Sequence, residues 1–134
     1  MGEVLWYLMC GAFGKDITLD EGDRVAIERV QSYGIAGASL LRTAEVGGRL
    51  YQQATWKGLQ PTWLYRREIL RALDVTGKGN RDSLVRERLI EMHGGDAKTA
   101  KGTKKNPGPL FGVSSHAWAA LAVAVVAAME VEND

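Results

Sequence analysis

The sequence predicts a mixed α/β fold built as one domain. Short apolar runs that end at glycine are typical of buried strands, and they alternate with longer stretches whose apolar residues recur every three or four positions, as in amphipathic helices. The chain has 134 residues, 46% of them apolar, which is enough for one hydrophobic core and little more. We therefore expect a single domain over residues 1–134, with strands and helices interleaved along the chain.

Three segments have the composition of β-strands. Residues 4–10 form an apolar, aromatic run, and residues 24–30 form a second apolar run that contains Glu28. Residues 61–65 are expected to form a third strand, but a longer helix that begins near Pro61 is the alternative, because proline is favoured in the first turn of a helix.

Two helices are expected in the first half of the chain. Over residues 38–57 the apolar positions follow helical spacing, although the pair Gly47-Gly48 weakens the expectation of a continuous helix. A short helix is expected over residues 66–73, closed by Gly77.

Two further helices are expected in the second half. One begins at residue 80 or 82, where the side chain is suited to capping, and ends at residue 93 before two glycines. The other, residues 116–131, is capped by Ser114 or Ser115 and is so rich in alanine and valine that it is expected to be buried across the sheet.

Between these helices, residues 94–112 contain five glycines, two prolines and four lysines. This composition predicts a mobile basic surface loop. Such a loop is either a flap that binds phosphate or a solvated linker, and its glycine content fits both.

Charge is distributed unevenly along the chain, although the net charge is only +1. Residues 57–105 carry twelve Lys and Arg against six Asp and Glu, whereas residues 1–56 and 106–134 are net acidic. A basic surface for a phosphate backbone, with carboxylates elsewhere for metal ions, would have this pattern. A solvated charged helix followed by a lysine-rich loop would have it as well.

Several classes of protein are not supported by the sequence. No apolar run approaches the roughly 18 residues of a membrane span, and the start of the chain lacks the pattern of a secretion signal, so we expect a cytoplasmic protein without a membrane partner. Cys10 is the sole cysteine and is expected to be a buried strand residue, because the two histidines, His93 and His116, do not give it zinc-ligand spacing. Phosphate-loop, nucleophile-elbow and Cys-x-x-Cys motifs are also missing.

Glu28 and His116 are the side chains whose positions most suggest chemistry. A carboxylate within an apolar strand is unfavourable unless it is paired or bound to metal, but strand alternation also allows Glu28 to share a face with Ala26 and Val30, pointing at solvent or pairing with an arginine. His116 can cap the last helix, pack in the core, or serve as a metal ligand or general base. Three tryptophans are spaced as core or interface residues, with base stacking as the lesser alternative: Trp56, Trp63 and Trp118.

Three stretches, in the same order along the chain, resemble RuvC-type Holliday-junction resolvases, especially the short members from phages and prophages. Residues 25–34 (VAIERVQSYG) are similar to the family strand that supplies a catalytic glutamate. Residues 77–86 (GKGNRDSLVR) resemble the glycine turn and helix that begin the family's basic segment, and residues 114–124 (SSHAWAALAVA) resemble its closing helix.

The resemblance implies an RNase H-like mixed sheet flanked by helices, and a homodimeric, structure-selective endonuclease that cleaves branched DNA. It also implies two Mg²⁺ ions, with Mn²⁺ as a possible substitute, one of which activates water while the other stabilises the leaving oxygen. Glu28 and His116 would be the catalytic and metal-binding residues. DNA contacts are expected from the basic segment, at Arg66, Arg67, Lys78, Arg81, Lys98, Lys101, Lys104 and Lys105.

The sequence departs from the family at two acidic positions. Ala119 stands where the family has an aspartate three residues after the histidine, and the chain lacks the usual first strand with its aspartate. Replacement carboxylates would have to come from Glu3, Asp16, Asp20 or Asp23. Two alternatives to the endonuclease therefore stay open: a catalytically incomplete module of the same fold that binds branched DNA, and a structural α/β domain without a nucleic-acid role.

Overall fold

The computed structural model describes residues 21–32, 34, 35 and 37–133. Within them the elements are, in order, β1 (Ala26–Arg29), α1 (Ala38–Trp56), β2 (Thr62–Tyr65), α2 (Arg66–Ala72), α3 (Arg81–Met92), α4 (Ala97–Lys101) and α5 (Ala117–Glu132). The predicted strand 4–10 with Cys10, and the carboxylates of Glu3, Asp16 and Asp20, lie outside the described residues. The predicted mixed α/β class is confirmed.

The two strands form a parallel pair. Ala26 lies opposite Thr62 and Arg29 opposite Tyr65, and the Thr62 N–H donates to the Val25 carbonyl oxygen at 2.9 Å just before the register begins. Parallel neighbours need a long crossover, and the 19-residue helix α1 supplies it. The carboxyl ends of both strands therefore lie at the same edge of the sheet.

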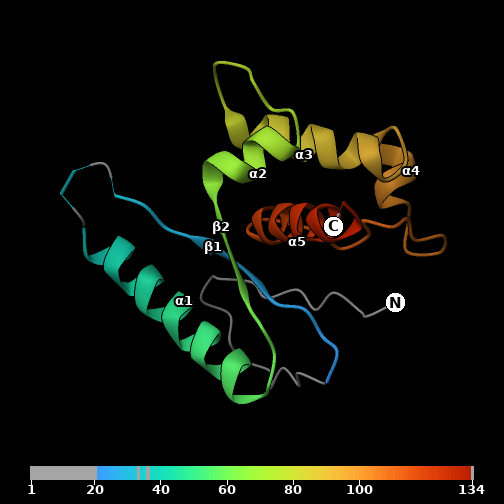
Figure 1. The fold of residues 1–134 in the computed structure, drawn as a ribbon. Coiled ribbons are helices and arrows are strands. Elements are labelled where there is room, and N and C mark those ends of the chain that lie inside the picture. The colour runs from blue at the N-terminus through green and yellow to red at the C-terminus, as the bar shows by residue number, and fades with distance from the viewer. Residues whose placement is uncertain (1–20, 33, 36, 134) are drawn as a thin grey trace.

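Helices cover both faces of this sheet (Figure 1). Alternate residues of β1 face opposite ways, so Ile27 packs with Leu50 and Ala54 of α1, whereas Ala26 packs against the larger core. That core lies on the opposite face and includes Leu64 of β2. The βαβ unit thus divides the apolar side chains into two clusters, one on each face of the sheet.

The larger cluster joins α2, α3 and α5 to the sheet. Ile69, Leu89 and Val126 are fully buried in it, one from each helix. Helix α5 contacts both strands, as predicted for an alanine- and valine-rich helix that lies across the sheet. Although α5 is strongly apolar, no helix in the described part of the chain is long and apolar enough to cross a membrane.

The boundaries in the first half of the chain differ little from those predicted. Helix α1 continues through Gly47-Gly48, where Gly47 is buried. Residues 62–65 form a strand, so the alternative of one long helix from Pro61 is wrong. Helix α2 ends before Gly77: Asp74 takes a left-handed conformation (φ 57°), and the Val75 N–H donates to the Leu70 carbonyl oxygen at 2.9 Å.

The prediction of a loop over residues 94–112 needs correction. Helix α4 forms within it because the Asp96 carboxylate accepts the Thr99 N–H at 2.8 Å, which caps the helix. Ala100 and Leu110 are buried in the larger core, so this segment is anchored at two points. The composition predicted a loop because the glycines and prolines outnumber the apolar residues. The two apolar side chains of Ala100 and Leu110 nevertheless suffice to attach the segment to the larger core.

The predicted serine cap of the last helix is also wrong. The residue at the N-cap of α5 is His116, which makes no side-chain capping hydrogen bond. Ser115 has a left-handed backbone (φ 50°), and the helix begins at Ala117, one residue later than a Ser115 cap and two residues later than a Ser114 cap would require.

Candidate nucleic-acid interface

Glu28 lies at the carboxyl edge of the sheet, one residue before the end of β1. It stands opposite Leu64 in the parallel register, and it shares a face with Ala26, as the alternation predicted. Both of those neighbours belong to the larger core. The Glu28 carboxylate is therefore half-buried at the border between the apolar interior and the edge of the sheet.

Three influences act on the ionisation of Glu28. Burial is the largest and raises the pKa of the carboxyl above its ordinary value, because the charged form loses hydration. The Arg66 guanidinium acts in the opposite direction and lowers the pKa, whereas the negative charge of Asp82 raises it. The net result is a raised pKa. A cation close to Glu28 would therefore stabilise the charged form of its carboxyl group.

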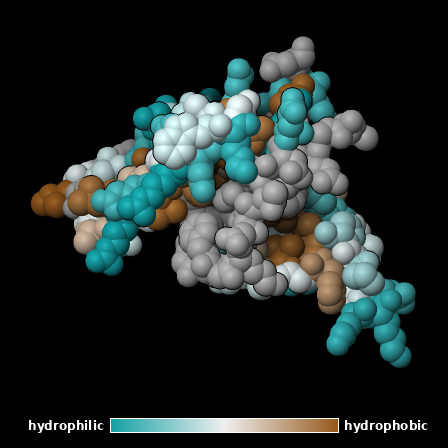
Figure 2. Space-filling model, turned by 90° about the horizontal axis from the view of Figure 1, so that it is seen from below, coloured by the Kyte–Doolittle hydropathy of each residue, from teal (hydrophilic) through white to brown (hydrophobic). Residues whose placement is uncertain are grey.

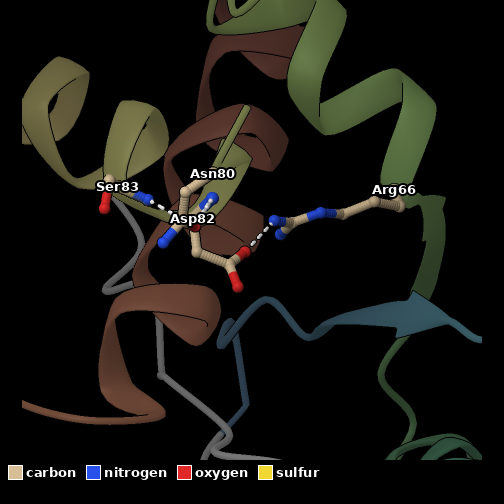
Figure 3. A network of polar contacts seen from close by, with 4 residues as sticks. All are labelled: Arg66, Asn80, Asp82 and Ser83. Carbon is tan, nitrogen blue, oxygen red and sulfur yellow. Dashed lines mark hydrogen bonds and ion pairs between the residues drawn. The ribbon is translucent and has the colours of Figure 1, made fainter. Parts of the chain in front are cut away.

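Arg66 and Asp82 are joined to each other by an ion pair (Figure 3). Arg66 is the first residue of α2, directly after β2, and its Nη2 donates to Oδ1 of Asp82 in the first turn of α3. The position of Asp82 is set by Asn80, whose side-chain oxygen accepts the N–H groups of Asp82 and Ser83 at 3.2 and 3.4 Å. The capped start of α3 thus holds one end of the ion pair beside the end of β1.

A cleft of about 720 Å³ opens at this edge of the sheet. Glu28 lines it together with residues from α2, from the segment that follows α2, and from the start of α3. Five arginines also line it: Arg29, Arg66, Arg67, Arg71 and Arg81. A cleft that combines one half-buried carboxylate with five guanidinium groups is suited to a polyanion, because guanidinium groups bind phosphate through paired hydrogen bonds.

The predicted DNA-binding residues fall into two groups. Arg66, Arg67 and Arg81 line the cleft, and Lys78 is exposed in the segment between α2 and α3. The four lysines of the second group lie on α4 and in the turn after it, beyond the other end of α3 (Figure 1): Lys98, Lys101, Lys104 and Lys105. Helix α3 has 12 residues, so it is about 18 Å long and separates the two groups.

The structure adds three charged residues to the site that sequence reasoning missed. Arg29 and Arg71 line the cleft, and Asp82 pairs with Arg66 at its edge. Two signals were present in the sequence: Arg29 directly follows Glu28, and Arg71 lies one helical turn after Arg67. Asp82 had no such signal, because its partner lies 16 residues away.

His116 is exposed at the start of α5 and is not among the residues that line the cleft. In residues 21–32, 34, 35 and 37–133, no group of three or more His, Cys, Asp and Glu side chains is arranged to hold a metal ion. The joint metal site of Glu28 and His116 therefore stays a prediction.

Of the three tryptophans, Trp118 is buried, Trp63 is half-buried and Trp56 is exposed. Trp118 is a core residue, as expected, and its ring is 5.4 Å from the Arg86 guanidinium carbon and 5.6 Å from the Lys101 Nζ. These contacts attach α3 and α4 to α5.

No known protein family matches this chain, and no curated protein or solved structure is significantly similar to it.

Proposed function

We propose that this chain is a structure-selective endonuclease that cleaves phosphodiester bonds in branched DNA, with an RNase H-like fold. The observation that carries the proposal is the position of Glu28 at the carboxyl edge of parallel strands, inside a cleft lined by five arginines. The resemblance of residues 25–34, 77–86 and 114–124 to RuvC-type resolvases supplies the reaction and the branched substrate. Helix α5, which lies across the β1–β2 pair, agrees with the proposed fold.

The arginines would hold the DNA backbone. Arg67, Arg71 and Arg81 are exposed, and they come from two helices that line the cleft, α2 and α3. Each guanidinium can donate two parallel hydrogen bonds to one phosphate, which fixes the strand in register as well as attracting it. The lysines near α4 would add a second contact about one helix length away, a separation that suits an extended or branched nucleic acid.

A Mg²⁺ ion fits the chemistry of the carboxylates. Mg²⁺ is commonly held by one or two carboxylates together with substrate phosphates and waters. Glu28 lines the cleft, and the charge of Asp82, at the start of α3, acts on it. Glu28 and Asp82 would supply donors for one ion, or for Mn²⁺ in its place. When bound, the ion would polarise a phosphate oxygen and lower the pKa of a bound water. Glu28 would then be ionised, and Arg66 would stabilise its charge.

Homodimer formation is part of the proposal. Leu41 and Trp56 of α1 are exposed at 56% and 79%, and Ile35 ahead of the helix is 102% exposed. Figure 2 shows the molecule from below, with a small brown apolar area at its left-hand tip. Burial of these three side chains between two subunits would remove their apolar surface from water.

A second candidate is a module of the same fold that binds branched DNA without cleaving it. Ala119 favours it, because this residue is exposed in the first turn of α5, three residues after His116, and brings no carboxylate to a position where the resolvases have one. Binding would then depend on the arginines and lysines alone.

The experiment compares a synthetic four-way junction with a linear duplex of the same length and base composition. The parent chain, Glu28→Gln and Glu45→Gln are each incubated with Mg²⁺, and binding is measured separately with Mg²⁺ removed by chelation. We expect Mg²⁺-dependent cleavage of the junction in preference to the duplex, reduced on the order of 100-fold or more by Glu28→Gln, with junction binding retained. Glu45 is exposed on α1, so Glu45→Gln is the matched control and should cleave normally.

Each outcome separates the candidates. Tight, salt-sensitive binding of the junction without cleavage would overturn the endonuclease and favour the binding module. If the junction is not bound even at low salt, both candidates fail.

A further inference from the structure

Arginines and aromatic rings alternate on the face of the sheet that α1 covers. The parallel register pairs Ile27 with Trp63 and Arg29 with Tyr65, so Arg29 lies beside both rings on one face. The guanidinium carbon of Arg29 is 5.4 Å from the centroid of the Trp63 ring and 5.8 Å from that of Tyr65. One cation therefore bridges two aromatic rings of the neighbouring strand.

The arrangement continues in both directions. Tyr51 of α1 stacks on Trp63, with centroids 5.2 Å apart and ring planes 6° from parallel. At the other end, the guanidinium carbon of Arg67 is 5.3 Å from the Tyr65 centroid. We call these five residues the Arg–aromatic ladder. Both arginines of the ladder are exposed and the three rings are half-buried, so the surface open to solvent is mainly guanidinium with aromatic edges beside it.

The Arg–aromatic ladder adjoins the cleft. Arg29 and Arg67 belong to the ladder and also line the cleft with Glu28. A DNA strand whose phosphates lie in the cleft would therefore bring its bases within reach of the ladder. Paired bases are stacked inside the duplex and cannot use such a surface, whereas unpaired bases stack readily on aromatic rings and on guanidinium planes.

We propose that the Arg–aromatic ladder binds unpaired nucleobases of the DNA strand that the cleft holds by its phosphates. This inference rests on the proposed function only in that the cleft binds a DNA backbone; it does not require cleavage. Charge complementarity favours a DNA strand at this surface, because Arg29 and Arg67 attract its phosphate backbone. The same guanidinium groups are flat and weakly hydrated, so bases can stack on them. The recognised feature would be a short unpaired segment, such as the open centre of a branch.

The test separates bases from phosphates. Affinity is measured for a thymine oligonucleotide and for an abasic strand of equal length, which carries the same phosphates without bases. We expect the thymine strand to bind at least about fivefold more tightly, since stacking of a single base contributes roughly five- to 150-fold. In the double variant Arg29→Lys with Arg67→Lys the charge is kept and the two guanidinium planes are lost, while the three rings remain. Abasic binding should therefore stay within about twofold, and the preference for the thymine strand should fall.

Arg42→Lys is the matched control, because Arg42 is an exposed arginine of α1 that does not belong to the ladder, and it should leave both affinities unchanged. Equal affinity of the parent chain for the two strands would overturn the inference, as would a preference that is undiminished in the double variant. A base preference in a chain that does not cleave the junction would leave the inference standing while the endonuclease fails. Unchanged abasic binding also reports that the double variant is folded.

Discussion

Arg66 pairs with Asp82 across 16 positions of the chain, and the pair connects the first residue of α2 to the first turn of α3. The side chain of Asp82 is 84% exposed, so the pair contributes little to stability because water screens it. Its effect is electrostatic, since both partners act on Glu28 with opposite signs. An ion pair at the surface thereby influences the pKa of Glu28, the half-buried carboxylate that lines the cleft.

The substitution Asp82→Asn should lower the pKa of Glu28. It removes a negative neighbour and leaves Arg66 without its carboxylate partner, and both changes favour ionised Glu28. It should also strengthen junction binding roughly two- to fivefold at low salt, because one repulsive charge is lost from the edge of the cleft. The pKa is measured by NMR titration of the Glu28 side-chain carboxyl carbon. Glu87→Gln on the exposed surface of α3 is the control, and an unchanged Glu28 pKa in Asp82→Asn would contradict the prediction.

The substitution Glu28→Gln should raise stability at neutral and mildly alkaline pH but not in acid. The pKa of Glu28 is raised in the folded state, so its contribution to stability is present below its ordinary pKa and is lost as pH rises through the folded pKa. Glutamine removes that loss. Urea unfolding of the parent chain and of Glu28→Gln at about pH 4 and about pH 8 measures the difference between their free energies of unfolding. This difference should be larger at the higher pH. For the control Glu45→Gln, the difference from the parent chain should not increase with pH. A gain in stability for Glu28→Gln that is confined to acid would refute the raised pKa of Glu28.

The two basic groups should contribute separately to DNA binding. Arg81→Gln in the cleft and Lys104→Gln beyond α4 should each reduce the slope of log affinity against log salt by about 0.9, and the double variant by about 1.8. Additivity is expected because the length of α3 lies between them. Fluorescence anisotropy of a labelled junction over a salt series gives the slopes. If Lys104→Gln leaves the slope unchanged, the contact is confined to the cleft.

Replacement by alanine should have opposite effects on stability at two glycines, Gly108 and Gly48. A Cβ on Gly108 would lie 2.3 Å from the Ala100 carbonyl oxygen, so Gly108→Ala must displace the turn after α4 and should destabilise the protein by at least about 1–3 kcal/mol. A Cβ on Gly48 meets nothing within 4 Å, and Gly48→Ala should stabilise α1 by about 0.5–1 kcal/mol. Chemical denaturation measures both. Equal tolerance at the two positions would show that the turn after α4 does not pack against α4 in solution.

Local sequence patterns predicted most of the helices and strands, because these elements form through interactions between residues that are close in the sequence. Helical periodicity predicted α1, the capping side chains at residues 80 and 82 placed the start of α3 within two residues, and alternation in β1 placed Glu28 on the same face as Ala26. Each of these depends on residues fewer than about five positions apart, for which spacing decides the geometry. The predicted serine cap of α5 failed even so, because the left-handed turn at Ser115 moved the start of the helix.

The site was predicted only in part. Glu28 and three of the arginines that line the cleft were singled out from the sequence, whereas the Arg66–Asp82 pair and the Arg–aromatic ladder were not. Those contacts join residues from different elements, and their distances depend on how α2 and α3 pack on the sheet.

The sequence by itself determined the α/β class, the alternation that places Glu28 on the same face as Ala26, and the excess of basic residues in the middle segment. Only the tertiary structure decided how those charges are divided: arginines gather with Glu28 at the carboxyl edge of the strands, while α3 holds the lysines of 98–105 a helix length away. The physical reason is that charge and periodicity are properties of the chain, whereas proximity follows from the burial of apolar faces that are far apart along it.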